Sequence, residues 1–143
     1  MQRRDFLKSS CRVCLLGAAG YLTHTLAGCS PATYQVTKTP VVNNTVSLPV
    51  ALFAQSSLQI VRPAGTYFDI AVRKKEDGTY SALLLQCTHQ ENGLQVTGNG
   101  YVCSEHGSTF TKEGKVTKGP AEEALTQYPT SVNQDAIIIY LKK

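Results

Sequence analysis

The sequence of 143 residues has no long apolar run, and beyond its first residues it shows no convincing helical period. Its longest weakly apolar stretch, Val13 to Leu26, is interrupted by glycine, threonine and histidine. This stretch is too short and too polar to cross a membrane, which takes about 20 apolar residues. With 42% apolar and 17% charged residues, the chain has an ordinary globular composition, and its length fits one domain once the N-terminus is set aside. The lack of helical period favours an all-β fold.

The sequence also lacks an excess of basic charge outside its N-terminus. Of 14 basic and 10 acidic residues, four basic residues and one acidic residue lie within the first 12 positions, which leaves 10 and 9. The formal net charge of +4 therefore belongs mostly to the N-terminus. This balance excludes nucleic acid as an expected partner.

The N-terminus has the features of an export signal. Arg3 and Arg4, followed by Asp5-Phe6-Leu7-Lys8, resemble a twin-arginine (Tat) signal. Leu26-Ala27-Gly28-Cys29 resembles a bacterial lipobox, in which cleavage precedes the cysteine and the cysteine receives lipid. We therefore expect residues 1–28 to be a cleaved signal peptide and Cys29 to anchor the chain to a bacterial membrane, facing the periplasm. The alternative is an N-terminal helix that stays attached.

Residues 29–44 follow the signal: after Cys29, residues 30–44 are rich in Thr, Pro and Asn, which predicts a flexible tether. Extended, fifteen such residues would span roughly 50 Å at about 3.3 Å each. The alternative is an arm that pairs with a strand and packs on the domain. From residue 45 to 143, short β-rich runs alternate with turns such as Asp77-Gly78 and Asn99-Gly100. The expected strands are 46–53, 58–62, 68–75, 79–86, 101–102, 109–112, 115–117, 125–133 and 136–141.

Cysteine and histidine are scarce once the N-terminus is set aside. Cys11, Cys14, Cys29 and His24 lie within it, so only Cys87, His89, Cys103 and His106 remain. They form two loops, Cys-x-His and Cys-x-x-His, and each loop offers one thiolate and one imidazole. Two such loops face to face predict a metal site. A disulfide between the two cysteines is the alternative for an exported protein, but it leaves both histidines unexplained.

The spacing helps to choose the metal. Structural zinc sites usually pair like ligands on one loop or helix, whereas each loop here is mixed. A binuclear cluster accounts for the mixing if both thiolates hold one iron and both imidazoles hold the other. Zinc also accepts two cysteines and two histidines, so a zinc-stabilised β interaction module remains the alternative.

The motif resembles that of the Rieske iron–sulfur proteins. The similarity spans about residues 45–140, and it includes the loops Cys87-Thr88-His89 and Cys103-Ser104-Glu105-His106-Gly107-Ser108, then Phe110, Gly114-Lys115-Val116 and Gly119-Pro120-Ala121. It implies a 2Fe–2S cluster held by Cys87, His89, Cys103 and His106. It also implies an antiparallel β-sandwich or barrel base with a small cluster-binding lobe of about 87–121, covered by a loop containing Pro120.

The chain departs from the quinol-oxidising members of this family. Their ligand loops carry two further cysteines that form a disulfide, and here those positions are Asn92 and Glu105. The resemblance implies that the Ser108 hydroxyl donates to a cluster sulfur and raises the potential, while Phe110 lacks the hydroxyl of the family's tyrosine. A Glu105 carboxylate would disfavour the added electron. We therefore predict an intermediate potential and, if His89 and His106 reach the surface, proton-coupled reduction at alkaline pH.

These features predict an electron-transfer protein. Its partner would be a quinol-linked or molybdenum-type oxidoreductase, or a cytochrome, and the chain could equally be the small subunit of such a complex. An oxygenase needs a further iron site of two histidines and a carboxylate, and no histidine is left to build one.

Overall fold

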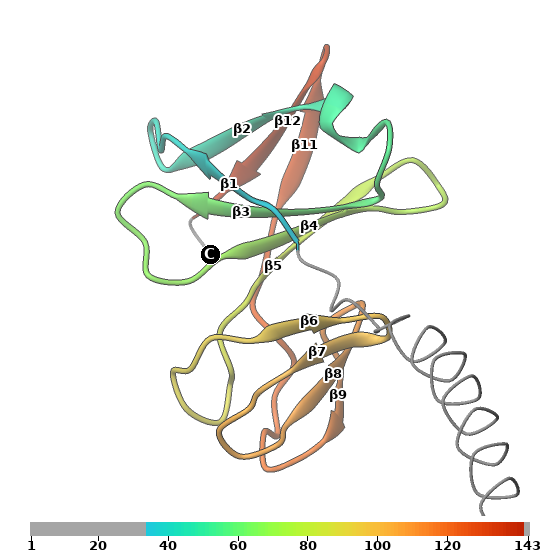
Figure 1. Ribbon diagram of the computed structural model, residues 1–143. Helices are drawn as coiled ribbons and strands as arrows, with labels where there is room; N and C mark the ends of the chain where they lie inside the picture. The colour runs from blue at the N-terminus through green and yellow to red at the C-terminus, as the bar shows by residue number, and fades with distance from the viewer. Residues whose placement is uncertain (1–33, 142–143) are drawn as a thin grey trace, which may run out of the picture. The chain divides into compact units, whose positions relative to one another are not determined.

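The computed structural model describes residues 34–141, and this part of the chain is all-β apart from one short 3-10 helix, as predicted (Figure 1). Its strands form three sheets of five, three and four strands. No helix among these residues is long and apolar enough to span a membrane. The predictions for Arg3, Arg4 and Cys29 concern positions outside the described residues.

The five-stranded sheet is the middle layer of the domain. Its order is β1-β3-β4-β5-β10, and all neighbours are antiparallel except β1 and β3. Alternate residues of β3 to β5 point to opposite faces, as the strand period requires. Both faces are buried, so the sheet contributes to two hydrophobic cores. Its strands are β1 (Val36–Thr39), β3 (Leu58–Pro63), β4 (Ile70–Lys74), β5 (Tyr80–Leu84) and β10 (Gln127–Tyr128).

Strand β1 lies within the segment predicted as a tether. Val36 to Thr39 pair in parallel with Ile60 to Pro63 of β3, and the Ala64 amide donates to the Thr39 carbonyl at 2.8 Å. A strand-pairing arm, the alternative interpretation, therefore describes these residues. The alternation of threonine with valine and lysine suits an edge strand, but nothing local to it specifies the partner strand.

The three-stranded sheet covers one face of the middle layer. It consists of β2 (Thr45–Pro49), β12 (Ala136–Tyr140) and β11 (Thr130–Asn133), with β12 in the centre. The strand predicted for 46–53 is too long, because Pro49 has no amide hydrogen to continue the ladder. A 3-10 helix, Val50–Phe53, follows instead.

The two cores are separated by the middle sheet. Val61, Val72 and Ala82 face the three-stranded sheet, where they meet Ile137 and Ile139 of β12. Their neighbours in sequence, including Ile60, Ala71 and Leu83, face the other way. That second core also contains Cys87 and Cys103, so the predicted thiolate ligands are part of the hydrophobic packing of the domain.

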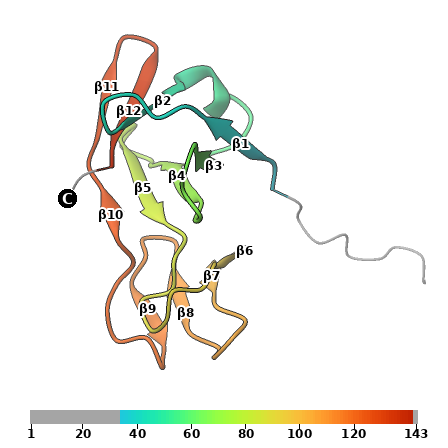
Figure 2. The same cartoon turned by 90° about the vertical axis from the view of Figure 1, so that its left-hand side faces the viewer.

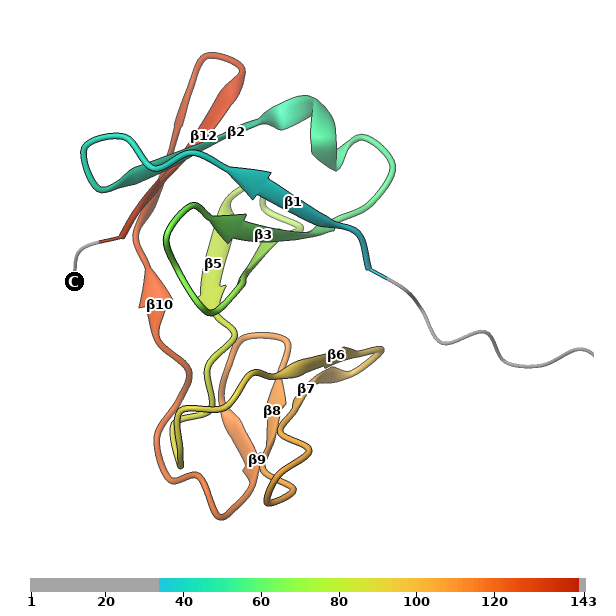
Figure 3. The ribbon, with the colours of Figure 1, turned by 60° about the vertical axis from the view of Figure 1, so that its left-hand side comes forward.

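The second core is completed by a lobe, which Figure 2 and Figure 3 show joined to the base through β5 and β10. The lobe sheet has the order β6-β7-β8-β9 and is antiparallel throughout. The chain leaves the base after Leu84 and returns at Thr126, and the Leu84 amide donates to the Thr126 carbonyl at 2.9 Å. The lobe strands are β6 (Gln95–Thr97), β7 (Gly100–Val102), β8 (Thr109–Thr111) and β9 (Val116–Lys118). Of these, β6 was not predicted.

Candidate metal centre

The first predicted ligand loop leaves the base directly after β5. It is closed by its own backbone, since the Cys87 amide donates to the Asn92 carbonyl at 2.8 Å and the Asn92 amide donates to the Gln90 carbonyl at 2.6 Å. Cys87 is buried, with 3% of its surface exposed, whereas His89 at the bend is exposed. The loop therefore turns its sulfur inward and its imidazole outward.

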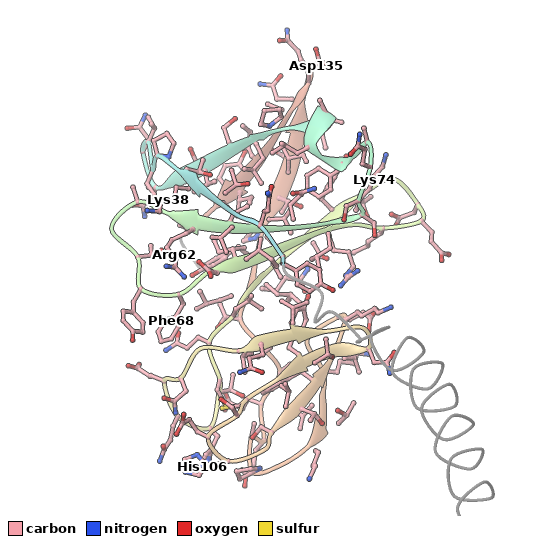
Figure 4. All side chains as sticks on the ribbon, in the orientation of Figure 1. Lys38, Arg62, Phe68, Lys74, His106 and Asp135 are labelled. Atoms are coloured by element: carbon pink, nitrogen blue, oxygen red, sulfur yellow. The ribbon has the colours of Figure 1, made fainter. Side chains whose placement is uncertain are left out.

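The second predicted ligand loop follows β7 and has the same character. The Cys103 amide donates to the Ser108 carbonyl at 2.9 Å, and the Gly107 amide donates to the Cys103 carbonyl at 3.0 Å. Gly107 has φ +77°, a conformation that glycine adopts without strain. Cys103 is 1% exposed, while His106 is exposed at the end of the lobe that lies away from the base (Figure 4).

The two loops bring like atoms together. The imidazole rings of His89 and His106 lie edge to face, with centroids 5.2 Å apart and planes at 84°. Cys87 and Cys103 are free thiols rather than a disulfide. The structure thus contradicts the disulfide alternative. It places two buried thiols and two exposed imidazole rings on the two loops.

The environment of Cys87 favours its thiolate. Burial alone would raise the pKa of the thiol, but hydrogen bonds from the Gln90 and His89 backbone, from the Cys103 thiol and from the Ser108 hydroxyl together lower that pKa. Donors directed at a sulfur are what a bound thiolate requires, because the thiolate is the form that ligates metals.

The donor set fits two metal ions better than one. Among residues 34–141, no group of three or more Cys, His, Asp or Glu side chains is placed to hold a metal ion. The four side chains are instead arranged in two pairs, a buried sulfur pair and an exposed nitrogen pair. A 2Fe–2S cluster with His₂ in place of Cys₂ on one iron has this division of ligands.

A third loop closes over the side of the site. It contains Gly119-Pro120-Ala121, in which Pro120 is exposed and follows a cis peptide bond. The Ala121 amide donates to the Ser108 hydroxyl at 3.0 Å, and the Thr88 hydroxyl donates to the Glu123 carbonyl at 2.7 Å. Ser108 is fully buried. Its hydroxyl oxygen accepts a hydrogen bond from the third loop, while its hydroxyl hydrogen can still be donated to a sulfur.

The remaining predicted tuning residues differ in burial. Phe110 is 2% exposed and lies opposite Tyr101 in the β7–β8 pairing, whereas the Glu105 side chain is exposed. Sequence reasoning missed Thr88 and Tyr101. The acceptor of Thr88 lies 35 residues away, and the burial of Tyr101 depends on the lobe sheet, so neither has a local sequence signal.

An all-β domain with two Cys/His loops folded against each other at the end of an inserted lobe defines an iron–sulfur protein with mixed ligation. The sequence matches the family model of the Rieske [2Fe-2S] domain over residues 34–129. The chain belongs to this family, and its cofactor is a Rieske-type 2Fe–2S cluster. It is an electron-transfer protein of that family.

Solved structures agree with this assignment. The plasma membrane Rieske protein PetC3 of the cyanobacterium Synechocystis PCC 6803 is 27% identical, with a TM-score of 0.53 over 64% of this chain and 93% of PetC3. Two others share the fold alone. A hyperthermophilic respiratory Complex III chain is 17% identical, with a TM-score of 0.53 over 95% of this chain and 99% of its own.

The other is a chain from the oxygenase–ferredoxin complex of carbazole 1,9a-dioxygenase, 19% identical with a TM-score of 0.50 over 68% of this chain and 94% of its own. No curated protein matches the sequence.

Proposed function

We propose that the chain is a membrane-tethered one-electron carrier, or the electron-transfer subunit of a larger oxidoreductase, and that Cys87, His89, Cys103 and His106 hold its cluster. The observation that carries this proposal is the pairing of two buried thiols with two exposed imidazoles on two self-closed loops. When bound, the cluster accepts and releases one electron.

The chain's own residues provide what an electron carrier needs. The cysteines lie in the hydrophobic core, which keeps water from the sulfur side of the site. His89 and His106 present their rings to solvent, so a partner can approach the site at the imidazole edges. The partner would be a quinol-linked or molybdenum-type oxidoreductase, or a cytochrome.

The midpoint potential should be intermediate for the family. Asn92 and Glu105 stand where a second pair of cysteines would form a disulfide, and backbone hydrogen bonds close both loops instead. Phe110 has no hydroxyl to donate, while Ser108 retains one. A redox titration that placed the midpoint near the top of the Rieske range, roughly +300 mV, would contradict this part of the proposal.

The location rests on residues 1–29. A twin-arginine signal exports folded proteins, which suits a cluster assembled before transport, and a lipid on Cys29 would hold the domain at the periplasmic side of a membrane. The similarity to a plasma membrane Rieske protein supports this location. Cys29→Ala should move the protein from the membrane fraction to the soluble periplasmic fraction, whereas Arg3→Lys with Arg4→Lys should retain it in the cytoplasm.

The metal assignment has a direct test. The purified full chain should contain two irons and two sulfides per chain, with the visible and EPR spectra of a Rieske centre. Cys87→Ser and Cys103→Ser should abolish these signals, and Ser104→Ala, an exposed change in the same loop, should leave them intact. A colourless protein with one zinc would instead establish the zinc-stabilised module.

A further inference from the structure

The three loops that surround the imidazoles carry charge of a single sign. Residues 87–93, 103–108 and 119–125 contain no lysine or arginine. Their charged residues are Glu91, Glu105, Glu122 and Glu123, which we call the glutamate ring, and all four side chains are exposed.

The glutamate ring is held near the two histidines by covalent neighbours and hydrogen bonds. Glu105 directly precedes His106, and Glu91 follows His89 by two residues. Glu122 and Glu123 belong to the third loop, which is fixed to the first loop by the hydrogen bond from Thr88 to the Glu123 carbonyl and to the second by that from Ala121 to Ser108. The ring therefore draws on every loop that borders the site.

None of these carboxylates is neutralised within the described chain. The one ion pair among residues 34–141 joins Arg62 and Asp69, at an N–O distance of 2.6 Å. The nearest basic residue in sequence is Lys118, the last residue of β9. The loops that carry the imidazoles thus also carry carboxylates without an ion-pair partner among residues 34–141, and a partner approaching the site will meet their negative field.

Basic residues are found elsewhere. Arg73, Lys74, Lys75 and Lys112 line one cavity beside the β4–β5 turn, where they are accompanied by Glu76, Asp77 and Glu113. In Figure 4 the labelled Lys38, Arg62 and Lys74 lie on the base, and His106 lies at the end of the lobe. Apart from the ring, residues 34–141 contain eight basic and five acidic side chains. The three loops therefore carry a formal charge of −4, whereas the remainder of residues 34–141 carries +3.

We propose that the electron-transfer partner of this protein presents a positively charged rim, rich in lysine or arginine, around its own cofactor. This inference rests on the proposed function, because it takes the imidazole edges as the contact point for electron transfer. Complementary charge at the rim of a contact orients the partners and raises the association rate, and salt screens the effect over about 10 Å at 0.1 M. A purely apolar partner surface would lack this attraction, and an acidic partner surface would be repelled.

Two inorganic oxidants of opposite charge test the proposal. The reduced full chain is mixed in a stopped-flow instrument with tris(phenanthroline)cobalt(III), a trivalent cation, or with hexacyanoferrate(III), a trivalent anion. One electron passes from the protein to one oxidant complex, and no bond forms or breaks. The rate constant with the cation should fall as salt is added, and that with the anion should rise.

Neutralising the ring should remove this preference. The variant with Glu91, Glu105, Glu122 and Glu123 all changed to Gln should lower the ratio of cation to anion rate constants about tenfold or more at low salt. Lys118→Gln should raise the ratio. The matched control neutralises four carboxylates elsewhere, Glu76→Gln, Asp77→Asn, Glu113→Gln and Asp135→Asn, and should leave the ratio close to that of the wild type.

A second measurement does not depend on electron transfer. Titration with hexaamminecobalt(III), which we use as an inert trivalent cation, should shift backbone amide NMR signals of Glu122 and Glu123 and spare that of Glu76. Equal effects of the two fourfold variants, or shifts spread evenly over the surface, would overturn the proposal. Loss of the iron–sulfur spectrum in the wild-type chain would instead overturn the proposed function, so the two failures are distinguishable.

Discussion

Ser108 combines two tasks in one buried hydroxyl. Its oxygen accepts the Ala121 amide at 3.0 Å, and its hydrogen is available to the sulfur side of the site. A serine is needed for both, because alanine leaves the Ala121 amide without a partner and the sulfur without a donor.

Ser108→Ala should therefore lower the midpoint potential. If the hydrogen bond to sulfur strengthens by about 1.4 kcal/mol on reduction, its loss lowers the potential by about 60 mV for one electron. A redox titration monitored by EPR measures the shift. Ser104→Ala changes an exposed hydroxyl of the same loop and should leave the potential unaltered. An unchanged potential in Ser108→Ala would show that its role is limited to holding the third loop.

Tyr101 lies in the lobe core with its phenol oxygen buried and without a hydrogen-bond partner among the described residues. Burial raises the pKa of this phenol, an effect that the nearby Arg73 only partly offsets. Because the unfolded chain ionises its tyrosines near pH 10, the contribution of the buried neutral phenol to the free energy of unfolding is fully present below that pH. It falls as the pH rises from about 10 through the raised pKa of the folded state.

Tyr101→Phe should remove this alkaline loss. Because the Arg73 Nε is also buried without a partner among the described residues, loss of the phenol oxygen should leave the stability at neutral pH within about 1 kcal/mol of the wild type. Chemical denaturation between pH 7 and pH 11 measures both effects. Tyr67→Phe is the matched control, because the Tyr67 side chain is 85% exposed. Parallel stability curves for Tyr101→Phe and the wild type would contradict the account.

At the scale of elements, the strand pair β7–β8 positions the second ligand loop, and Gly100 permits the close approach of β7 to β8. Gly100 has φ +151°, and a Cβ there would overlap the Phe110 carbonyl oxygen of the facing strand. Gly100→Ala should therefore destabilise the protein by about 3 kcal/mol or more and prevent cluster retention. Iron content and thermal denaturation are the measurements.

Gly98→Ala provides the comparison for Gly100→Ala. A Cβ at Gly98 meets nothing within 4 Å, so this change should cost at most about 1 kcal/mol. Similar losses in the two variants would mean that the effect comes from the turn and not from the contact with β8.

Thr88 connects the first and third loops through its bond to the Glu123 carbonyl. Thr88→Val should cost about 1 kcal/mol, the usual net value of such a bond, and should speed loss of iron to a chelator because the third loop is released. Ser131→Ala removes a hydrogen bond to Tyr140 in the three-stranded sheet and should leave the rate of iron loss unchanged. Equal rates of iron loss in the two variants would contradict this role.

Sequence patterns predicted most strands and the two ligand loops, because alternation and turn residues act locally. Val46 to Leu48 alternate as expected, and Cys87 and Cys103 stand at loop starts. The rest depends on distant partners. The parallel pairing of β1 with β3, the short strand β6 and the third-loop contacts of Ser108 and Thr88 are set by tertiary packing, which no local pattern contains.

For the whole molecule, the arrangement of the cores predicts how the protein unfolds without its cluster. The core between the middle sheet and the three-stranded sheet contains no predicted ligand, whereas the core beneath the lobe contains Cys87 and Cys103. Removing iron should therefore raise hydrogen exchange in β7 to β9 much more than in β2 and β12.

Exchange measured by mass spectrometry on the cluster-bound and iron-free chains tests this expectation. Tyr140→Phe, a change confined to the three-stranded sheet, should affect both forms alike. Uniform deprotection of the two cores after iron removal would show that the domain is a single cooperative unit.

The hydrogen bond between Leu84 and Thr126 marks where the lobe is joined to the base, and it has a consequence for engineering. Strand β5 ends and its antiparallel neighbour β10 begins at this point, so the segment that connects the two strands has a short distance to span. Residues 85–125 can accordingly be regarded as a transplantable redox head, which other antiparallel strand pairs could accept in place of an ordinary turn. What such a host must supply is an apolar sheet face against which the sulfurs can be buried.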